Sequence, residues 1–516
     1  MGDLVPPRSV CARAAALLLA CAACAGDDET PSQSIPGLVT VSTNAPWASS
    51  CTGPAGTGVV FHDAEVEPSV AIDPTDPKHL IGAWQQDRWS NGGSNGVVSA
   101  VTFDGGHTWQ RTTPRFTRCS EGAYQRGTDP WVTIGPTGTA FVIVYAYDQD
   151  KVNRAMLVSR SSDRGLTWDE PKTLQHDVDP NLVMDKETVT ADPLDAKYAY
   201  AVWDRLTGFT DPTNSKNTGP AWFARTTDGG DTWEPARQIY DPGPDTQTIS
   251  NQIAVLPGGA LVNVLMVAAQ NSSTNPRITI QAIRSSSRGE TWPDPAVSIA
   301  EAQFVGVNDP KTKRGIRSGS VVHSVALDRS SNGTLYVVWE DARFSQMARD
   351  GIALSRSIDG GLNWSAPVQV NGASAPAFTP TVAVANGGKI GVTYYDLRRD
   401  DPADSTHLLV THWLAVSTDG GTTFTESMIG APFNLQAAPL VEGPAWFLGD
   451  YQALVSDGSV FLPFFVAVPQ GGAANVYFRP ADAVPVTADP VAVAARTVQQ
   501  LWRGARERWR FDTLFK

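Results

Sequence analysis

Six arginines of this 516-residue chain stand where they could recognise an acidic group. Each lies close to a short apolar stretch of β-branched and aromatic residues, which predicts a position near the end of a β-strand. A guanidinium binds a carboxylate through two parallel hydrogen bonds, so arginines gathered at one place favour an acidic ligand. The six are Arg88, Arg126, Arg205, Arg317, Arg343 and Arg398. Because several have an aspartate beside them, an ion pair within the fold is the alternative interpretation.

A second polar set precedes or begins the apolar strands. If equivalent strands surround a common axis, the side chains of this polar set and the six arginines converge at one end of the central channel. We expect the functional site there. The members of this polar set are Glu67, Asp129, Lys186, Glu187, Asn251, Gln252, His323, Asp450 and Tyr451.

The elements that position these residues follow from an eight-residue turn motif. It occurs as TFDGGHTW (102–109), SSDRGLTW (161–168), TTDGGDTW (226–233), SSSRGETW (285–292), SIDGGLNW (357–364) and STDGGTTF (417–424). Its third residue is Asp104, Asp163, Asp228, Ser287, Asp359 or Asp419. A short polar side chain here accepts hydrogen bonds from turn amides, glycine supplies a positive φ, and tryptophan packs between sheets. Because these aspartates recur in nearly every repeat, we expect them to be structural.

Upstream of the turns runs a second repeat, an alternating strand, a tight turn and another apolar strand. Seven copies lie between residues 68 and 468. With one strand before and one after each turn, every unit has four strands, which is one propeller blade. The sequence predicts an all-β propeller of four-stranded antiparallel blades over residues 37–487. Seven blades are favoured and six are the alternative, with Leu38–Ser42 as the strand that closes the ring.

The turn motif matches the Asp-box, and the chain resembles the sialidase-like, Asp-box (BNR) β-propellers over about residues 38–485. The resemblance implies an exo-α-sialidase-like glycosidase whose active site faces away from the Asp-boxes. In that family three arginines bind the substrate carboxylate, a tyrosine assisted by a glutamate is the nucleophile, and an aspartate is the acid/base. The segment GDYQAL (449–454) is similar to the one around that nucleophile. The resemblance therefore implies Tyr451 as nucleophile, Glu442 as its partner and Asp87 as acid/base.

One departure weakens this assignment. The family opens its first blade with a Phe/Tyr-Arg-Ile-Pro motif, but that place here reads EVEP (65–68), without arginine. One arginine of the triad is missing unless Arg88 or Arg126 replaces it. A non-catalytic propeller that binds glycan or protein therefore stays open, as does a polysaccharide lyase that acts on uronate glycans.

The N-terminus predicts export to the bacterial cell envelope or outside it. Residues 1–25 combine Arg8 and Arg13 with a short apolar stretch, as a signal peptide does. The residues before Cys21 resemble a lipobox, so Cys21 is the predicted lipidation site and Cys24 its rival. Cleavage without a lipid is the alternative. Residues 26–36 are polar and predict a linker.

Cys51 and Cys119 are the cysteines left in the body, and an exported chain can join them as a disulfide. The net charge of −13 argues against nucleic-acid binding. We predict no cofactor, no metal, an acidic glycan as the partner, contact with a membrane only through a lipid, and a monomer. Residues 488–516 predict an amphipathic helix that either caps the propeller or binds a partner or an anionic membrane.

Overall fold

The computed structural model describes residues 37–51, 58–149, 152–207, 218–269, 277–293 and 295–481. The chain divides into a short unit, Met1–Ser32, and a large unit, Gln33–Lys516, to which the following applies. The predicted signal peptide 1–25 with Cys21 and Cys24, the linker 26–36 and the helix within 488–516 lie outside the described residues. No helix in the described ranges is long and apolar enough to cross a membrane.

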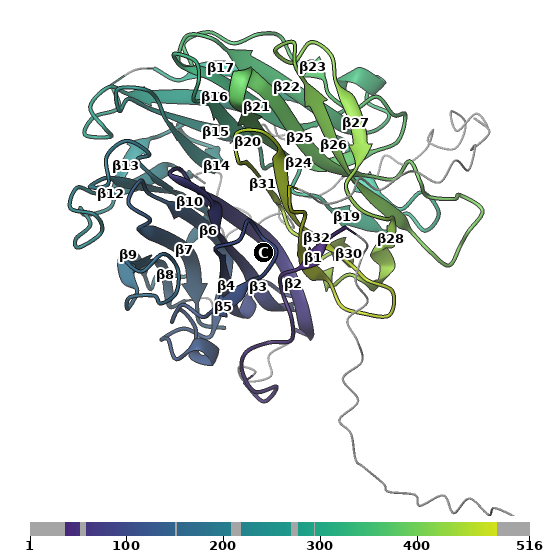
Figure 1. The fold of residues 1–516 in the computed structure, drawn as a ribbon, viewed down its shortest axis with the longest axis horizontal. Coiled ribbons are helices and arrows are strands. Elements are labelled where there is room, and N and C mark those ends of the chain that lie inside the picture. Colours follow the sequence, from purple (N-terminus) through teal and green to yellow (C-terminus); the bar gives the residue numbers. More distant parts are fainter. Residues whose placement is uncertain are drawn as a thin grey trace, which may run out of the picture. The chain divides into compact units, whose positions relative to one another are not determined.

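The described part of the large unit is all-β, and its strands form antiparallel sets of four in which consecutive strands are hydrogen-bonded neighbours (Figure 1). The first set contains β2 (Val60–Asp73), β3 (Asp76–Trp89), β4 (Ser94–Thr102) and β5 (Gln110–Thr112), and the second contains β6 (Arg126–Ile134), β7 (Ala140–Tyr147), β8 (Arg154–Ser161) and β9 (Lys172–Asp177).

The third and fourth sets follow in chain order. The third contains β10 (Leu182–Ala191), β11 (Ala199–Thr207), β12 (Ala221–Thr226) and β13 (Arg237–Tyr240), and the fourth contains β14 (Thr246–Val255), β15 (Leu261–Ala269), β16 (Arg277–Ser285) and β17 (Val297–Ala302).

The fifth set contains β20 (Ser324–Asp328), β21 (Thr334–Asp341), β22 (Gly351–Ser357) and β23 (Val368–Gln369). The sixth contains β24 (Ala377–Ala385), β25 (Lys389–Asp396), β26 (Leu409–Ser417) and β27 (Thr425–Met428), with β28 (Phe433–Asn434) beside β26.

The last set combines both ends of the described chain. β31 (Ala453–Ser456), β32 (Phe461–Ala467) and β33 (Asn475–Phe478) are joined by β1 (Val39–Thr40). In β1, Val39 pairs with Phe478 and Thr40 with Tyr477, in antiparallel register. A strand from the N-terminal side of the chain therefore completes the sheet that the last strands begin.

The first strands of successive sets lie side by side. β2 packs next to β6, β6 next to β10, β10 next to β14, β14 next to β20, β20 next to β24, β24 next to β31, and β31 next to β2. This order of neighbours returns to its start, which is consistent with a β-propeller. The strands read as continuous apolar runs, such as AFVIVYAY in β7, because each sheet is covered on both faces. Trp84, Trp203 and Trp339, on the second strands of three sets, are wholly buried.

A small additional sheet comes from two insertions that the sequence pattern does not predict. It contains β18 (Val307–Asn308), β19 (Gly315–Arg317), β29 (Leu440–Val441) and β30 (Ala445–Phe447). β19 and β30 pair in parallel, with Arg317 opposite Phe447. Four short 3-10 turns complete the described elements: η1 (Arg118–Ser120), η2 (Arg343–Ser345), η3 (Asn386–Gly388) and η4 (Leu435–Ala437).

Each Asp-box turn is closed by its own polar side chains. In the third copy, Oδ1 of Asp228 accepts hydrogen bonds from Thr226 Oγ1 (2.8 Å) and from the Thr232 amide (2.9 Å), and Oδ2 accepts from Thr232 Oγ1 (2.6 Å). Burial opposes ionisation of Asp228, but these hydrogen bonds outweigh it and lower its pKa to about 2. Ser287 takes the same place in the fourth copy, where its Oγ accepts from the Thr291 amide (2.9 Å).

The Asp-box turns also fix which loops share a face. The amides of Gly105 and Gly229, in the first and third copies, donate to the carbonyls of Lys78, near the start of β3, and Lys197, in the turn between β10 and β11. The Asp-box turns therefore lie beside the turns that join the first and second strands of the same sheets. We call the surface formed by these two kinds of turn the Asp-box face. Elsewhere, Cys51 and Cys119 are joined by a disulfide.

Candidate functional site

A repeated kink in the first strands aims one polar side chain per sheet toward its neighbours. The register with the second strand shifts by a bulge at the same place in β2, β6, β10, β14 and β24. Each bulge holds a residue of positive φ, which is rare outside glycine, and bulges re-aim side chains. The residues are Glu67 (54°), Asp129 (53°), Lys186 (49°), Ser250 (59°) and Thr379 (51°).

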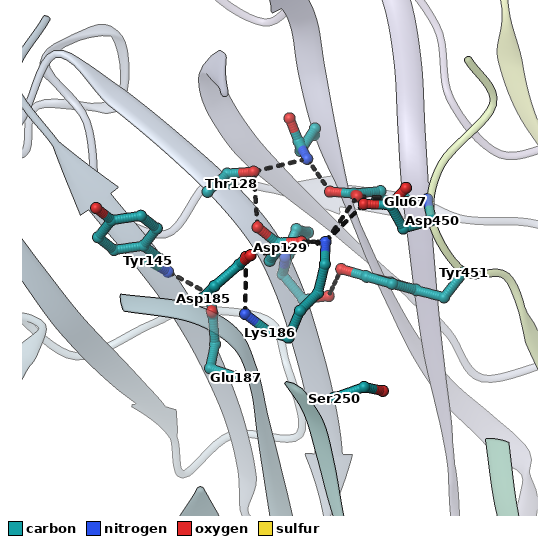
Figure 2. A network of polar contacts seen from close by, with 12 residues as sticks. Glu67, Thr128, Asp129, Tyr145, Asp185, Lys186, Glu187, Ser250, Asp450 and Tyr451 are labelled. Atoms are coloured by element: carbon teal, nitrogen blue, oxygen red, sulfur yellow. Dashed lines mark hydrogen bonds and ion pairs between the residues drawn. The ribbon is translucent and has the colours of Figure 1, made fainter. Parts of the chain in front are cut away.

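The first three bulges and the segment before β31 form a buried ion cluster (Figure 2). Nζ of Lys186 lies 2.6 Å from Oδ1 of Asp129, 2.7 Å from Oδ2 of Asp450 and 3.6 Å from Oε1 of Glu67. Arg317 of β19 closes the cluster, because its Nε donates to Oδ1 of Asp450 (2.8 Å) and a second guanidinium nitrogen donates to Oδ2. The convergence predicted for residues near the starts of the strands is therefore confirmed for Glu67, Asp129, Lys186 and Asp450.

The cations of this cluster and its burial set the ionisation of its carboxyl groups. Burial opposes ionisation of Asp450, but Arg317 and Lys186 outweigh it and hold the Asp450 pKa well below its usual range. Burial and the neighbouring Asp129 raise the pKa of Glu67 to about 8, so Glu67 is protonated at neutral pH. Asp129 and Asp450 thus face Lys186 and Arg317, and a further carboxyl group, that of Asp185, lies 4.0 Å from Nζ of Lys186. Oxygens of Glu67, Asp129 and Asp450 lie within 4.8 Å of one another, as in a cation site, and the Lys186 ammonium supplies the cation there.

Tyr451, the predicted nucleophile, lies against this cluster but is buried, with 8% of its surface exposed. Its hydroxyl donates to the Pro130 carbonyl (2.9 Å), and its ring packs edge-on against Trp131. Burial raises the Tyr451 pKa well above its usual range, and the carboxyl groups of Glu67 and Asp129 raise it further. This environment opposes a phenolate.

The two residues assigned to assist Tyr451 lie elsewhere. Oδ1 of Asp87 accepts from the Asp63 amide (2.8 Å), and Oδ2 accepts from Nε1 of Trp47 (2.8 Å) and from Asn95 (3.1 Å). Glu442 is half-buried and acts electrostatically on Arg126. Within the described ranges, no hydrogen bond joins Tyr451, Glu442 and Asp87 to one another.

Four of the six predicted arginines are paired with a carboxylate. Arg205 binds Asp177, Arg317 binds Asp450, Arg343 binds Asp341, and Arg398 binds both Asp396 and Glu426. Arg343 and Arg398 therefore each bind the aspartate two residues earlier, which is the last residue of the preceding strand (β21 or β25). The ion-pair interpretation describes these two better than a shared ligand site does.

Arg88 and Arg126 have no carboxylate partner among the described residues, although only 3% and 2% of their surfaces are exposed. Nη1 of Arg126 donates to Asn91 Oδ1 and to the Gly92 carbonyl (2.7 Å each), and its guanidinium stacks 4.3 Å from the centre of the Trp89 ring. Nη1 of Arg88 donates to Oε1 of Gln85 (2.8 Å). In the described structure, Nη2 of Arg126 and Nε of Arg88 have no acceptor.

Phe447, which no sequence motif marks, links the arginines to the additional sheet. The guanidiniums of Arg88 and Arg317 lie 4.8 and 4.9 Å from the centre of its ring. Arg88 also lowers the pKa of the Arg126 guanidinium, after the larger effect of burial. Arg88, Arg126 and Arg317 therefore form one cationic neighbourhood, in which Arg317 alone has a carboxylate partner among the described residues. Phe447 belongs to a three-residue strand, too short for a periodic sequence signal.

No known protein family matches the sequence, and no curated protein matches it. Solved structures that resemble it include the α-L-arabinanase of Penicillium chrysogenum in complex with arabinobiose, at 12% identity and a TM-score of 0.44, covering 87% of this chain and 99% of that one. An ulvan lyase, bound to a saccharide of glucuronate and sulfated rhamnose, has 10% identity and a TM-score of 0.46, covering 72% and 81%. The Trypanosoma rangeli sialidase with the inhibitor DANA has 13% identity and a TM-score of 0.39, covering 66% and 53%. Likeness at this level assigns no activity to this chain.

Proposed function

We propose that this chain recognises an acidic glycan through Arg88 and Arg126 and acts on it. The observation that carries the proposal is the pair of buried guanidiniums without a carboxylate partner in the described part of the chain, of which Arg88 keeps an Nε–H group without an acceptor. A buried charge is costly unless it is paired. The carboxylate of a sialic or uronic acid supplies two acceptor oxygens in the geometry that a guanidinium prefers.

Residues around the two arginines suit the rest of a sugar. Tyr147 hydrogen-bonds to the Arg126 side chain, Glu442 acts on it electrostatically, and the Asn91 side-chain oxygen accepts a hydrogen bond from it. A phenol, a carboxylate and an amide are the groups that hold sugar hydroxyls in place. The Asp-box aspartates have no part in this proposal, because donors of their own turns occupy their oxygens.

A more specific proposal is exo-sialidase-like hydrolysis, with Tyr451 as nucleophile, Glu442 as its partner and Asp87 as acid/base. The carboxylates near Tyr451 support a role in proton transfer, but its burial and raised pKa favour the alternative, binding without hydrolysis. A lyase that removes a proton from a uronate is the second alternative. The chain would act as a monomer and without a cofactor or metal.

Calorimetric titration of the purified chain tests the recognition. We expect N-acetylneuraminic acid or a glucuronate oligosaccharide to bind and a neutral arabinose oligosaccharide to bind at least tenfold more weakly, about 1.4 kcal/mol. Arg126→Gln and Arg88→Gln should each weaken acidic binding by a similar factor. The matched control is Arg277→Gln, whose guanidinium pairs with Glu301 at an exposed site. Equal affinity for acidic and neutral sugars would refute the proposal.

Incubation with a fluorogenic sialoside and with a uronate polymer separates the reactions. Release of the fluorophore indicates hydrolysis, and an unsaturated uronate indicates a lyase. Acidic binding without either product indicates the non-catalytic alternative.

We also propose that the fold is a seven-bladed propeller in which β1 closes the ring. Seven sets of four strands, with first strands that neighbour one another in a cyclic order, support this count over six. Export, with a lipid on Cys21 or Cys24, is a further proposal. The Cys51–Cys119 disulfide supports it, because structural disulfides persist in oxidising compartments.

A further inference from the structure

The indole ring of Trp89, on which the Arg126 guanidinium stacks, is itself held by a hydrogen bond. Its Nε1 donates to Oδ1 of Asn95 (2.7 Å), across the hairpin that joins β3 and β4. Both Trp89 and Asn95 are buried. A cation is attracted to the face of an indole ring, and this attraction depends on where the ring lies. Asn95 therefore sets the place of the ring that supports Arg126.

Asn95 is held in turn by Asp87, which lies opposite it on β3. The Asn95 side-chain amide donates to Oδ2 of Asp87 (3.1 Å), and the Asn95 main-chain carbonyl accepts from Oγ1 of Thr117 (2.7 Å). Asp87 has a φ of 61°, a conformation that is rare outside glycine, directly before Arg88. The hydrogen bonds to the Asp87 carboxylate therefore also stabilise the backbone from which Arg88 extends.

A second donor to Asp87 comes from the segment that follows β1. We call residues 41–51 the strap. The strap leaves the last sheet at β1, and the Cys51–Cys119 disulfide holds its other end. Between these anchors, Nε1 of the half-buried Trp47 donates to Oδ2 of Asp87 (2.8 Å). The strap and β4 therefore donate to the same carboxylate oxygen.

The sixth set of strands contains a different arrangement of the same groups. There the Arg398 guanidinium lies 3.8 Å from the centre of the Trp413 ring, and Nε1 of Trp413 donates to Asp396 (2.8 Å), which also binds Arg398. In the first set, the neutral amide of Asn95 takes the place of that carboxylate as the acceptor for Trp89 Nε1. The Trp89 ring is thus fixed by a group that cannot neutralise the guanidinium above it.

We propose that Asn95 and Trp47 are positioning residues for the acidic-glycan site, an inference that rests on the proposed function. They hold the Trp89 ring through their shared acceptor, Asp87, and the ring holds the Arg126 guanidinium where a ligand carboxylate can pair with it. A ring supports a buried cation without occupying its N–H groups, whereas a carboxylate from the protein would occupy them. The strap and its disulfide are therefore part of the recognition site.

Side-chain NMR of the full chain labelled with ¹⁵N-arginine tests the positioning without a ligand. The ring current of Trp89 displaces the Nε–H resonance of Arg126, which is identified by its loss in Arg126→Gln. Asn95→Leu removes both side-chain hydrogen bonds and should move this resonance toward that of an unstacked arginine. The matched control is Asn371→Leu, because the Asn371 amide is also buried and accepts from the Ile352 amide (2.8 Å) in the fifth set. It should leave the Arg126 resonance in place.

Calorimetric titration with N-acetylneuraminic acid and with a glucuronate oligosaccharide tests the link to recognition. Asn95→Leu should weaken acidic binding by at least about fivefold, because the ring under the guanidinium is released. Trp47→Phe keeps a ring but removes one hydrogen bond, so about threefold is expected. In the Arg126→Gln background neither change should weaken binding further, because residues that act through one another are not additive. Trp168→Phe is the control for Trp47→Phe, since the half-buried Trp168 donates its Nε1–H to Oγ1 of Thr112 (3.0 Å).

The outcomes separate this inference from the proposed function. If Arg126→Gln weakens acidic binding and Asn95→Leu does not, the positioning role is overturned and the proposed function stands. Additive losses in Asn95→Leu/Arg126→Gln would also overturn it, because Asn95 would then act on binding independently of Arg126. An Arg126 resonance that Asn95→Leu leaves in place would overturn it whatever the sugars do. A parent chain that binds neither acidic sugar would overturn both, and a resonance that still moves would then assign Asn95 to the fold alone.

Discussion

Nζ of Lys186 lies 2.7 Å from Oδ2 of Asp450, although the two residues are 264 positions apart in the sequence. Lys186 belongs to β10, while Asp450 directly precedes Tyr451 in the segment before β31. The same ammonium binds Asp129 of β6 and approaches Glu67 of β2. One buried cation therefore joins the sheets at the start of the chain to the sheet at its end.

Replacing Lys186 by methionine should destabilise the fold strongly. The substitution keeps the length of the side chain but leaves Asp129 and Asp450 facing each other with Arg317 as their remaining cation. Removing one partner of a buried ion network costs about 3–5 kcal/mol. Urea denaturation should show this loss in Lys186→Met and almost none in the control Lys172→Met, whose exposed ammonium bonds to the Asp231 carbonyl. Equal stability of the two variants would show that the cluster does not hold the sheets together.

The serine in the fourth Asp-box allows a test with a substitution that should stabilise the fold. Oγ of Ser287 is a single acceptor for the turn around Thr291, whereas Asp228 offers two oxygens to the turn around Thr232. Ser287→Asp should therefore add a hydrogen bond to an ionised acceptor and raise the free energy of unfolding by about 1 kcal/mol. The reciprocal change Asp228→Ser should lower it by a similar amount. Thermal denaturation at neutral pH measures both, and opposite shifts are expected.

Acid should weaken the fold through two buried histidines. Burial lowers the pKa of His323 and of His412 to about 3, whereas both titrate near 6.5 once the chain unfolds. Below pH 6.5 the unfolded chain therefore binds protons that the folded chain does not, and stability falls with pH until about 3. At pH 5 each histidine should remove about 2 kcal/mol relative to neutral pH.

The variant His412→Phe isolates this effect. The His412 ring packs 4.0 Å from Phe465 and 4.7 Å from Tyr395, centre to centre, so phenylalanine suits its surroundings. Buried carboxyls with raised pKa values, such as Glu340, act in the opposite direction, and the comparison of parent and variant cancels them. The variant should lose about 2 kcal/mol less than the parent between pH 7 and pH 5 in urea denaturation. Identical losses would contradict the assigned pKa.

The repeats made most of the architecture predictable, because each copy has the sequence pattern of the same turn or hairpin. The strands flanking the Asp-box copies and the seven hairpins correspond to sets of four strands, and the polar residues near the strand starts do meet. The additional sheet was not predictable, since its strands of two or three residues have no periodicity. Nor was the environment of Tyr451, whose hydroxyl bonds to a main-chain carbonyl 321 residues away. For Arg343 and Arg398, the sequence left open an ion pair with the neighbouring aspartate or a shared acidic ligand, and only the positions of the side chains distinguish the two.

The substitution Tyr451→Phe separates a structural from a catalytic role. The Tyr451 hydroxyl donates to the Pro130 carbonyl, and its loss leaves a buried acceptor unpaired, at a cost of about 1–2 kcal/mol. The control is Tyr395→Phe, because the buried Tyr395 hydroxyl also donates to a main-chain carbonyl, that of Val466 (2.7 Å), and in addition accepts from the Val466 amide (3.2 Å). Both variants should lose stability in urea, and Tyr395→Phe should lose at least as much as Tyr451→Phe because it removes two hydrogen bonds. If Tyr451 is the nucleophile, Tyr451→Phe should lower kcat on a sialoside by at least about a thousandfold, as expected when a covalent nucleophile is removed. Tyr395→Phe should keep the parent's kcat, so equal turnover by both variants would leave Tyr451 with a structural role.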